Sequence, residues 1–115
     1  MKAGDVVLVR FPFADAATTK KRPALLLSQV ARGRRYRLAT VAMITSQVDA
    51  LQLDGDVRLA GWEKAGLLHP SLLRLAKVAT VDGELVDKVI GRLMAEDLRA
   101  VGAAFRRLFA SWLGD

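Results

Sequence analysis

Three consecutive cations followed by a proline form the segment of this chain best suited to chemistry. Lys20, Lys21 and Arg22 end a polar loop, and Pro23 begins a short apolar run. Because proline fixes φ and has no N–H, it makes a rigid junction between this loop and a strand. A guanidinium mounted there can donate two parallel hydrogen bonds to a phosphate. The sequence therefore predicts anion binding at Arg22; simple attraction of a polyanion, or pairing with a nearby acid, is the alternative interpretation.

The positive charge of the chain is concentrated around this segment. The 115 residues include 18 lysines and arginines and 12 carboxylates, a formal net charge of +6. Seven of the cations and no carboxylate lie between residues 16 and 48, so the other 11 cations are nearly balanced by the 12 acids. A local positive field of this kind attracts polyanions. Its second half is an arginine-rich segment around Tyr36, made of Arg32, Arg34, Arg35 and Arg37. Such a segment suits a groove that follows phosphates and stacks a base, and a charged β-turn is the alternative.

The residue types exclude several other kinds of site. The chain has no cysteine and one histidine, His69, so it offers no thiolate nucleophile and no recognisable set of metal ligands, and we expect neither a metal nor a cofactor. His69 has the intrinsic chemistry for proton transfer, but it precedes Pro70 in a loop and is interpreted as a surface histidine. No apolar signal core and no apolar run of membrane-spanning length occur. We therefore expect a cytoplasmic protein that does not bind membranes.

Short apolar runs separated by turn residues predict five or six strands followed by one helix. The expected strands cover residues 6–11, 23–28, 36–44, 57–59 and 72–81. The block 88–94 is ambiguous, since an early short helix around 84–89 or a final strand would both fit. A helical stripe with spacings of three and four ends the chain, formed by Leu98, Val101, Phe105, Leu108 and Trp112. The hydrophobic content of 52% is enough for a folded core. We predict one domain over residues 1–115, of α+β class and mainly β: a small barrel with a C-terminal amphipathic helix.

Several ordered motifs resemble the MazF/PemK family of bacterial toxins. The motifs are residues 4–9 (GDVVLV), 11–13 (FPF), 22–28 (RPALLLS) and 45–47 (TSQ), with a looser match from residue 66 to 75 and in the C-terminal helix. The resemblance implies an SH3-like barrel, a homodimer, and a metal-independent endoribonuclease that cuts single-stranded RNA at preferred sequences. It also implies a cognate antitoxin, which we expect to be acidic and partly disordered.

The resemblance assigns roles to individual residues and leaves one role open. Arg22 matches the catalytic arginine, and Thr45 matches the active-site threonine. Lys21 and Ser71 stand where some members have histidine and aspartate, so the acid and base are unassigned; Asp15, in the loop before Arg22, is a candidate base. The residues expected to contact RNA are Lys20, Lys21, Arg34, Arg35, Arg37, Ser46 and Gln47. The alternatives are a non-catalytic domain of the same fold that binds protein, as gyrase-inhibiting toxins do, or an inactive RNA-binding member.

Overall fold

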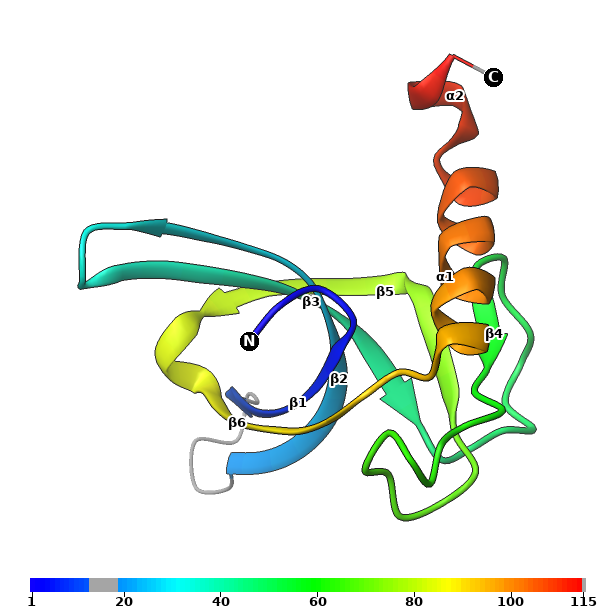
Figure 1. The fold of residues 1–115 in the computed structure, drawn as a ribbon, viewed down its shortest axis with the longest axis horizontal. Helices are drawn as coiled ribbons and strands as arrows, with labels where there is room; N and C mark the ends of the chain where they lie inside the picture. The colour runs from blue at the N-terminus through cyan, green and yellow to red at the C-terminus, as the bar shows by residue number, and fades with distance from the viewer. Residues whose placement is uncertain (13–18, 115) are drawn as a thin grey trace.

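A strongly curved antiparallel sheet beside one main helix makes up this computed structural model, which describes residues 1–12 and 19–114 (Figure 1). The strands in the described residues are β1 (Asp5–Pro12), β2 (Thr19–Arg32), β3 (Tyr36–Thr45), β4 (Asp56–Arg58), β5 (Leu72–Asp82) and β6 (Val86–Arg92). They lie in the order β4-β5-β3-β2-β1-β6, and every neighbouring pair is antiparallel. A 3₁₀ turn, η1 (Gly83–Leu85), joins β5 to β6, and the helices α1 (Ala95–Leu108) and α2 (Ala110–Leu113) follow. The predicted mainly β class with six strands and a C-terminal helix is confirmed; the sheet curls like a small barrel but does not close.

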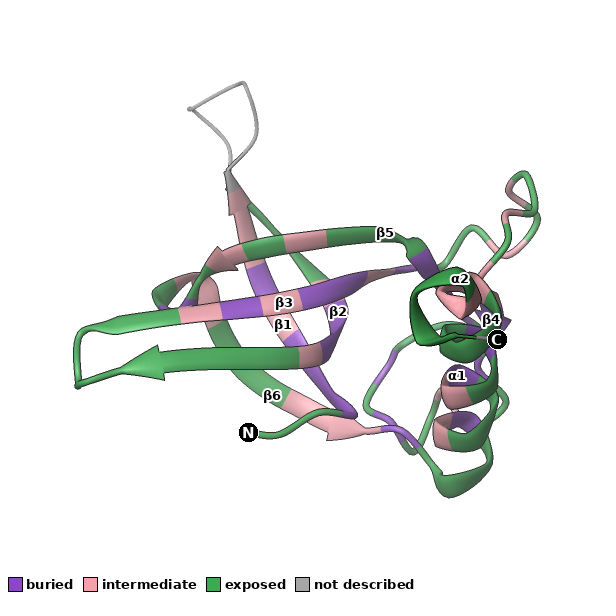
Figure 2. Cartoon of the chain, turned by 90° about the horizontal axis from the view of Figure 1, so that it is seen from above, coloured by how far each residue is buried: buried purple, intermediate pink, exposed green. Residues whose placement is uncertain are grey.

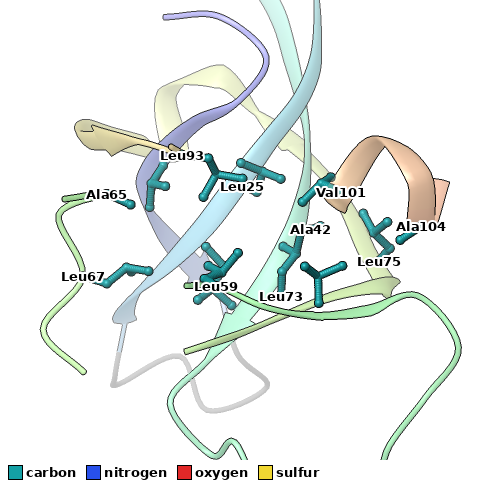
Figure 3. Close-up of a cluster of buried hydrophobic side chains, with 13 residues drawn as sticks. Leu25, Ala42, Leu59, Ala65, Leu67, Leu73, Leu75, Leu93, Val101 and Ala104 are labelled. Carbon is teal, nitrogen blue, oxygen red and sulfur yellow. The ribbon is translucent and has the colours of Figure 1, made fainter. Parts of the chain in front are cut away.

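Both faces of the central strands are buried, which explains their nearly continuous apolar sequence. On β1, Val6 belongs to one core cluster, whereas Val7 and Val9 belong to a second cluster. Since adjacent strand residues point to opposite faces, the two clusters cover opposite sides of the curved sheet. In the first cluster, Val101 and Ala104 of α1 pack with apolar side chains from the sheet (Figure 3). The helix therefore covers one face, and α1 lies next to β4 and β5 (Figure 1).

The observed bounds of β2 and α1 differ from those predicted, and the structure decides between the two predictions for the block before the helix. First, β2 begins at Thr19, so Pro23 is not its first residue and Arg22 lies inside the strand, opposite Val9. Second, the ambiguous block before the helix is a strand, β6, preceded by the short η1 turn. Third, α1 ends at Leu108, and Trp112 lies on the separate α2 with 88% of its surface exposed. The sequence predicts Trp112 in the core or at an interface; the core interpretation is wrong, because the chain leaves the helical path at Phe109, and the interface interpretation stays a prediction.

No helix in the described part of the chain combines the length and the apolar character that crossing a membrane requires.

Candidate functional site

A pocket of about 270 Å³ opens where the pairing between β2 and β3 stops. The β2–β3 ladder begins at Ala24, opposite Met43, so the first part of β2 pairs with β1 alone. At this point β3 ends at Thr45 and the chain turns away from β2. The pocket walls come from β1, β2, the end of β3, the segment before β5, and β6: Leu8, Arg22, Pro23, Ile44, Thr45, Ser46, Gln47, Gly66, Leu67, Leu68, His69, Ser71 and Ile90. Polar groups from three distant parts of the sequence thus meet over an apolar floor.

Four of the residues predicted from the sequence line this pocket together. Arg22 lies in β2 and is exposed, while Thr45, Ser46 and Gln47 form the opposing turn at the end of β3. The backbone N–H of Gln47 donates a hydrogen bond to Thr45 Oγ1 at 3.1 Å, which holds the turn in shape. A threonine hydroxyl that accepts one hydrogen bond can still donate its own proton to a bound anion. The arrangement therefore offers a guanidinium and a hydroxyl donor to one ligand.

His69 is a pocket residue that the sequence interpretation places elsewhere. The sequence predicts a plain surface histidine, and the residue is exposed, but it lies at the rim of the pocket that Arg22 and Thr45 line. Ser71 Oγ donates to the His69 carbonyl oxygen at 2.7 Å, so the turn before β5 is tied to itself. The cause is the β3–β5 register, which pairs Thr45 with Leu72. Residues that precede Leu72 must therefore lie next to residues that follow Thr45. Only that long-range pairing could have identified His69.

Close packing against β6 and α1 positions the wall that carries His69. The Asp97 carboxylate of α1, 2% exposed as a residue, accepts hydrogen bonds from the N–H groups of Ala60 at 3.0 Å and Gly61 at 2.8 Å. Gly66 has φ of +89°, and a Cβ there would lie 2.1 Å from the Ile90 carbonyl oxygen. The backbone therefore approaches β6 more closely than any residue with a side chain permits. The segment that leads to β5 is therefore held by α1 at Ala60 and Gly61 and by β6 at Gly66.

A buried ion pair fixes the segment that leaves the pocket after Gln47. Arg74 of β5 donates from Nε to Asp56 Oδ1 and from Nη2 to Asp56 Oδ2, both at 3.1 Å, with side-chain exposures of 9% and 2%. Arg74 also donates to the Leu51 carbonyl oxygen, and Asp56 accepts the N–H of Leu53 at 2.8 Å. Burial acts to raise the pKa of Asp56, but hydrogen bonds from Arg74 and Leu53 and the charges of Arg74 and Lys77 outweigh it and lower that pKa. The charged pair thus anchors the connection between β3 and β4.

The remaining residues predicted to bind RNA do not line this pocket. Lys20 is exposed on β2, and Lys21 Nζ lies 3.1 Å from Asp87 Oδ2 of β6, a partly exposed pair of small energetic value. Arg34, Arg35 and Arg37 lie at the far end of the β2–β3 hairpin, around a separate hollow. The single positive region expected between residues 16 and 48 is therefore divided into two surfaces. Asp15, the candidate base, lies outside the described residues. Within the described ranges, no three His, Cys, Asp or Glu side chains cluster as metal ligands would.

Comparison with known proteins identifies similar sequences and structures. Residues 2–109 match the family model described as PemK-like, MazF-like toxin of type II toxin–antitoxin system. No characterised protein matches the chain significantly by sequence search. Among solved structures, an endoribonuclease in complex with its cognate antitoxin from a mycobacterial species is similar with a TM-score of 0.70 and 13% identity, covering 96% of this chain and 95% of that one. The Mycobacterium tuberculosis toxin MazF-mt6 has a TM-score of 0.66 and 24% identity, covering 92% and 96%. At these identities the structural likeness establishes the fold.

Proposed function

This chain belongs to the PemK-like, MazF-like toxins of type II toxin–antitoxin systems, and from that membership we propose that it is a sequence-selective endoribonuclease that cleaves single-stranded RNA without a metal. The observation that supports the proposal most directly is the pocket in which Arg22, Thr45 and His69 meet. In this proposal residues 1–115 act as one toxin domain in the cytoplasm. Arg22 and Thr45 keep the roles that the family resemblance implies for them.

RNA can be cleaved without a metal because the ribose 2′-hydroxyl is its own nucleophile. The protein must then remove the proton of that hydroxyl, stabilise the pentacoordinate phosphorus, and protonate the leaving oxygen. Electrostatic stabilisation is usually the largest of these contributions. Arg22 supplies it in our proposal, since its guanidinium can bind two phosphate oxygens while Thr45 donates to a third. Ser46 and Gln47, beside Thr45, contact the RNA next to the scissile phosphate.

Proton transfer is the part of the reaction for which the pocket suggests a residue. Histidine changes its charge near neutral pH and is the side chain most often used as a general acid or base. We assign to His69 one of the two proton transfers, because it lines the same pocket as Arg22 and Thr45. Asp15 remains the candidate for the other transfer. Arg22 suits this work less well, because an arginine holds its proton far above neutral pH.

Cleavage assays with the purified protein test the proposed function. A mixed-sequence single-stranded RNA should be cut in the presence of EDTA and leave 2′,3′-cyclic phosphate ends, and RNA with 2′-deoxyribose at the cut sites should resist. Arg22→Ala should abolish cutting, whereas Arg99→Ala, which removes an exposed arginine from α1, should not. If the wild-type protein leaves the RNA intact and its expression does not slow growth, the proposal is wrong. Inhibited DNA supercoiling with intact RNA would instead favour protein binding.

Two protein partners belong to the same proposal. We propose that an acidic antitoxin neutralises the toxin, because an acidic segment can fold onto the positive surfaces and block RNA. A mycobacterial endoribonuclease of similar fold has been solved in complex with its cognate antitoxin. We also propose a homodimer. Its structural support is the exposed apolar end of the chain, where Trp112 is 88% and Leu113 58% exposed.

A further inference from the structure

The outer half of the β2–β3 hairpin extends beyond the rest of the sheet. On one side β1 pairs with β2 only as far as Leu25, and Gly4, just before β1, donates its N–H to the Leu26 carbonyl oxygen. On the other side β5 accompanies β3 only as far as Leu38, opposite Asp82. Beyond these points the two strands pair with each other alone, ending with Arg32 opposite Tyr36. We call residues 30–37 the arginine arm; Figures 1 and 2 show it projecting from the molecule and exposed along its length.

The arginine arm carries a dense positive charge that the rest of the described chain does not neutralise. Its four arginines are exposed: Arg32, Arg34, Arg35 and Arg37. None of them forms an ion pair with another residue of the described ranges. Two acids, Asp82 and Glu84, stand at the base of the arm and share a hollow of about 450 Å³ with three of the arginines. Three positive charges therefore face two negative ones at this hollow, and Arg32 adds a fourth positive charge elsewhere on the arm.

The hollow is shaped by close backbone packing at its base. A Cβ on Gly83 would lie 2.8 Å from Arg37 Cβ, so the absence of a side chain at Gly83 lets Arg37 lie directly against η1. Tyr36 lines the same hollow and is 56% exposed. An exposed aromatic ring flanked by guanidinium groups is a stacking platform beside phosphate-binding donors. Arginine forks and a stacking ring fit a single-stranded nucleic acid better than an acidic peptide, which has no bases to stack.

We propose that the arginine arm is a second RNA-binding surface, at which guanidinium groups bind phosphates and Tyr36 stacks on a base outside the cleavage pocket. Arg22 in the pocket and Arg32 in the arm are separated by ten residues of β2, roughly 30 Å along the strand. The two surfaces therefore contact different nucleotides of one RNA. The arm adds affinity for long RNA, and the pocket selects the bond that is cut. This inference depends on the proposed function for the identity of the anion as RNA.

Salt-dependent binding of an RNA that cannot be cut tests the arm separately from catalysis. The probe is a 2′-O-methyl RNA of about 20 nucleotides, long enough to contact both surfaces. Each phosphate that a variant no longer neutralises on a single strand lowers the slope of log Kd against log salt by about 0.7, so Arg34→Gln with Arg35→Gln should lower it by about 1.4. The matched control, Arg106→Gln with Arg107→Gln on α1, removes the same charge from another exposed surface and should leave the slope unchanged. Tyr36→Ser should weaken binding without changing the slope.

The possible outcomes are distinct from one another and from a failure of the proposed function. An arm variant with the wild-type slope, or an equally reduced slope in the α1 variant, overturns the proposal, since binding would then reflect net charge alone. An arm variant that binds RNA normally but no longer binds polyglutamate also overturns it and favours an acidic polypeptide as the ligand of the arm. A wild-type protein that binds RNA through the arm but never cuts it would contradict the proposed function and leave the arm supported.

Discussion

His69 carries a proton in the proposed reaction, and its contribution can be measured separately from binding. We expect His69→Ala to lower the cleavage rate by roughly 10²- to 10⁴-fold, the usual loss when a general acid or base is removed. His69→Gln keeps a hydrogen-bonding side chain but cannot transfer a proton. It should therefore bind RNA normally and cleave it as slowly as His69→Ala does. Single-turnover cleavage at saturating RNA measures the rate, and the Kd of an uncleavable 2′-O-methyl RNA measures binding.

Leu68→Ala provides the control, because this exposed pocket-lining side chain has no ionisable group. It should leave the single-turnover rate nearly unchanged. A wild-type cleavage rate in His69→Gln would contradict the assignment and make Asp15 the remaining candidate for proton transfer.

The Arg74–Asp56 pair links the stability of the pocket region to pH. Because the folded-state pKa of Asp56 is lowered, its carboxylate stabilises the fold above the ordinary carboxyl pKa, and this contribution disappears as pH falls through the lowered value. Asp56→Asn leaves the buried guanidinium without its charged partner and should cost about 3 kcal/mol at neutral pH. Urea unfolding at neutral pH and at acid pH measures both effects.

Two controls isolate the contribution of Asp56. Asp54→Asn changes an exposed neighbour and should change stability little. Part of the acid sensitivity should persist in Asp56→Asn, because hydrogen bonds from Lys2 and Arg92, opposed by burial, also lower the pKa of Asp5. Equal acid sensitivity in the wild type and Asp56→Asn would show that the ion pair does not control it.

At the scale of elements, the wall before β5 depends on a close contact with β6. Gly66→Ala would place a Cβ 2.1 Å from the Ile90 carbonyl oxygen at a φ of +89°, so the loop must move away from β6. We expect a loss of stability of about 2 kcal/mol or more, together with slower cleavage in the folded fraction, since Leu67 and His69 belong to this wall. Thermal unfolding and cleavage at a temperature where the variant is folded measure the two effects.

Gly33→Ala is the matched comparison for this change. Gly33 also has a positive φ, +68°, but nothing lies within 4 Å of the position its Cβ would occupy. It should therefore cost only about 1 kcal/mol of backbone strain. Equal effects of the two substitutions would show that backbone conformation, and not contact with β6, makes Gly66 necessary.

The elements that could be predicted from the sequence are those whose apolar residues are continuous. The central strands are recognisable because both of their faces are buried. The two ends of β2 carry polar residues with no hydrophobic pattern, so its true extent is visible only from its pairing with β1 and β3. Similarly, His69 joins the pocket through the β3–β5 register, a long-range pairing that local patterns do not encode. Arg22 and Thr45 could be identified from the sequence because each belongs to a recognisable motif. That the two residues line one pocket could not be predicted, because it depends on the folded sheet.

At the scale of the whole molecule, our proposals give the two positive surfaces different tasks: the pocket cleaves RNA, and the arginine arm adds binding affinity. The pocket has an apolar floor and few charges, which suits the positioning of one phosphate and its neighbours. The arginine arm has many charges and lies at the other end of the β2–β3 hairpin. An acidic antitoxin that covered both surfaces would gain affinity from two linked contacts, because the second contact is intramolecular once the first has formed.

The exposed apolar side chains of the C-terminal segment predict that the protein forms a dimer. Trp112 and Leu113 are largely exposed on α2, and Phe105, at 37% exposure, contacts Phe109 with ring centroids 4.9 Å apart and the rings tilted by 40°. Exposed aromatic and aliphatic side chains gathered at one end of a small protein are typical of an interface. We expect Trp112→Ser with Leu113→Ser to convert a dimer into a monomer in light scattering, with little change in the fold, since neither residue is buried here. Leu51→Ser, which changes a leucine that is 81% exposed outside this segment, should leave the dimer intact. A monomeric wild type, or a doubly substituted protein that remains dimeric, would place the interface elsewhere or remove it.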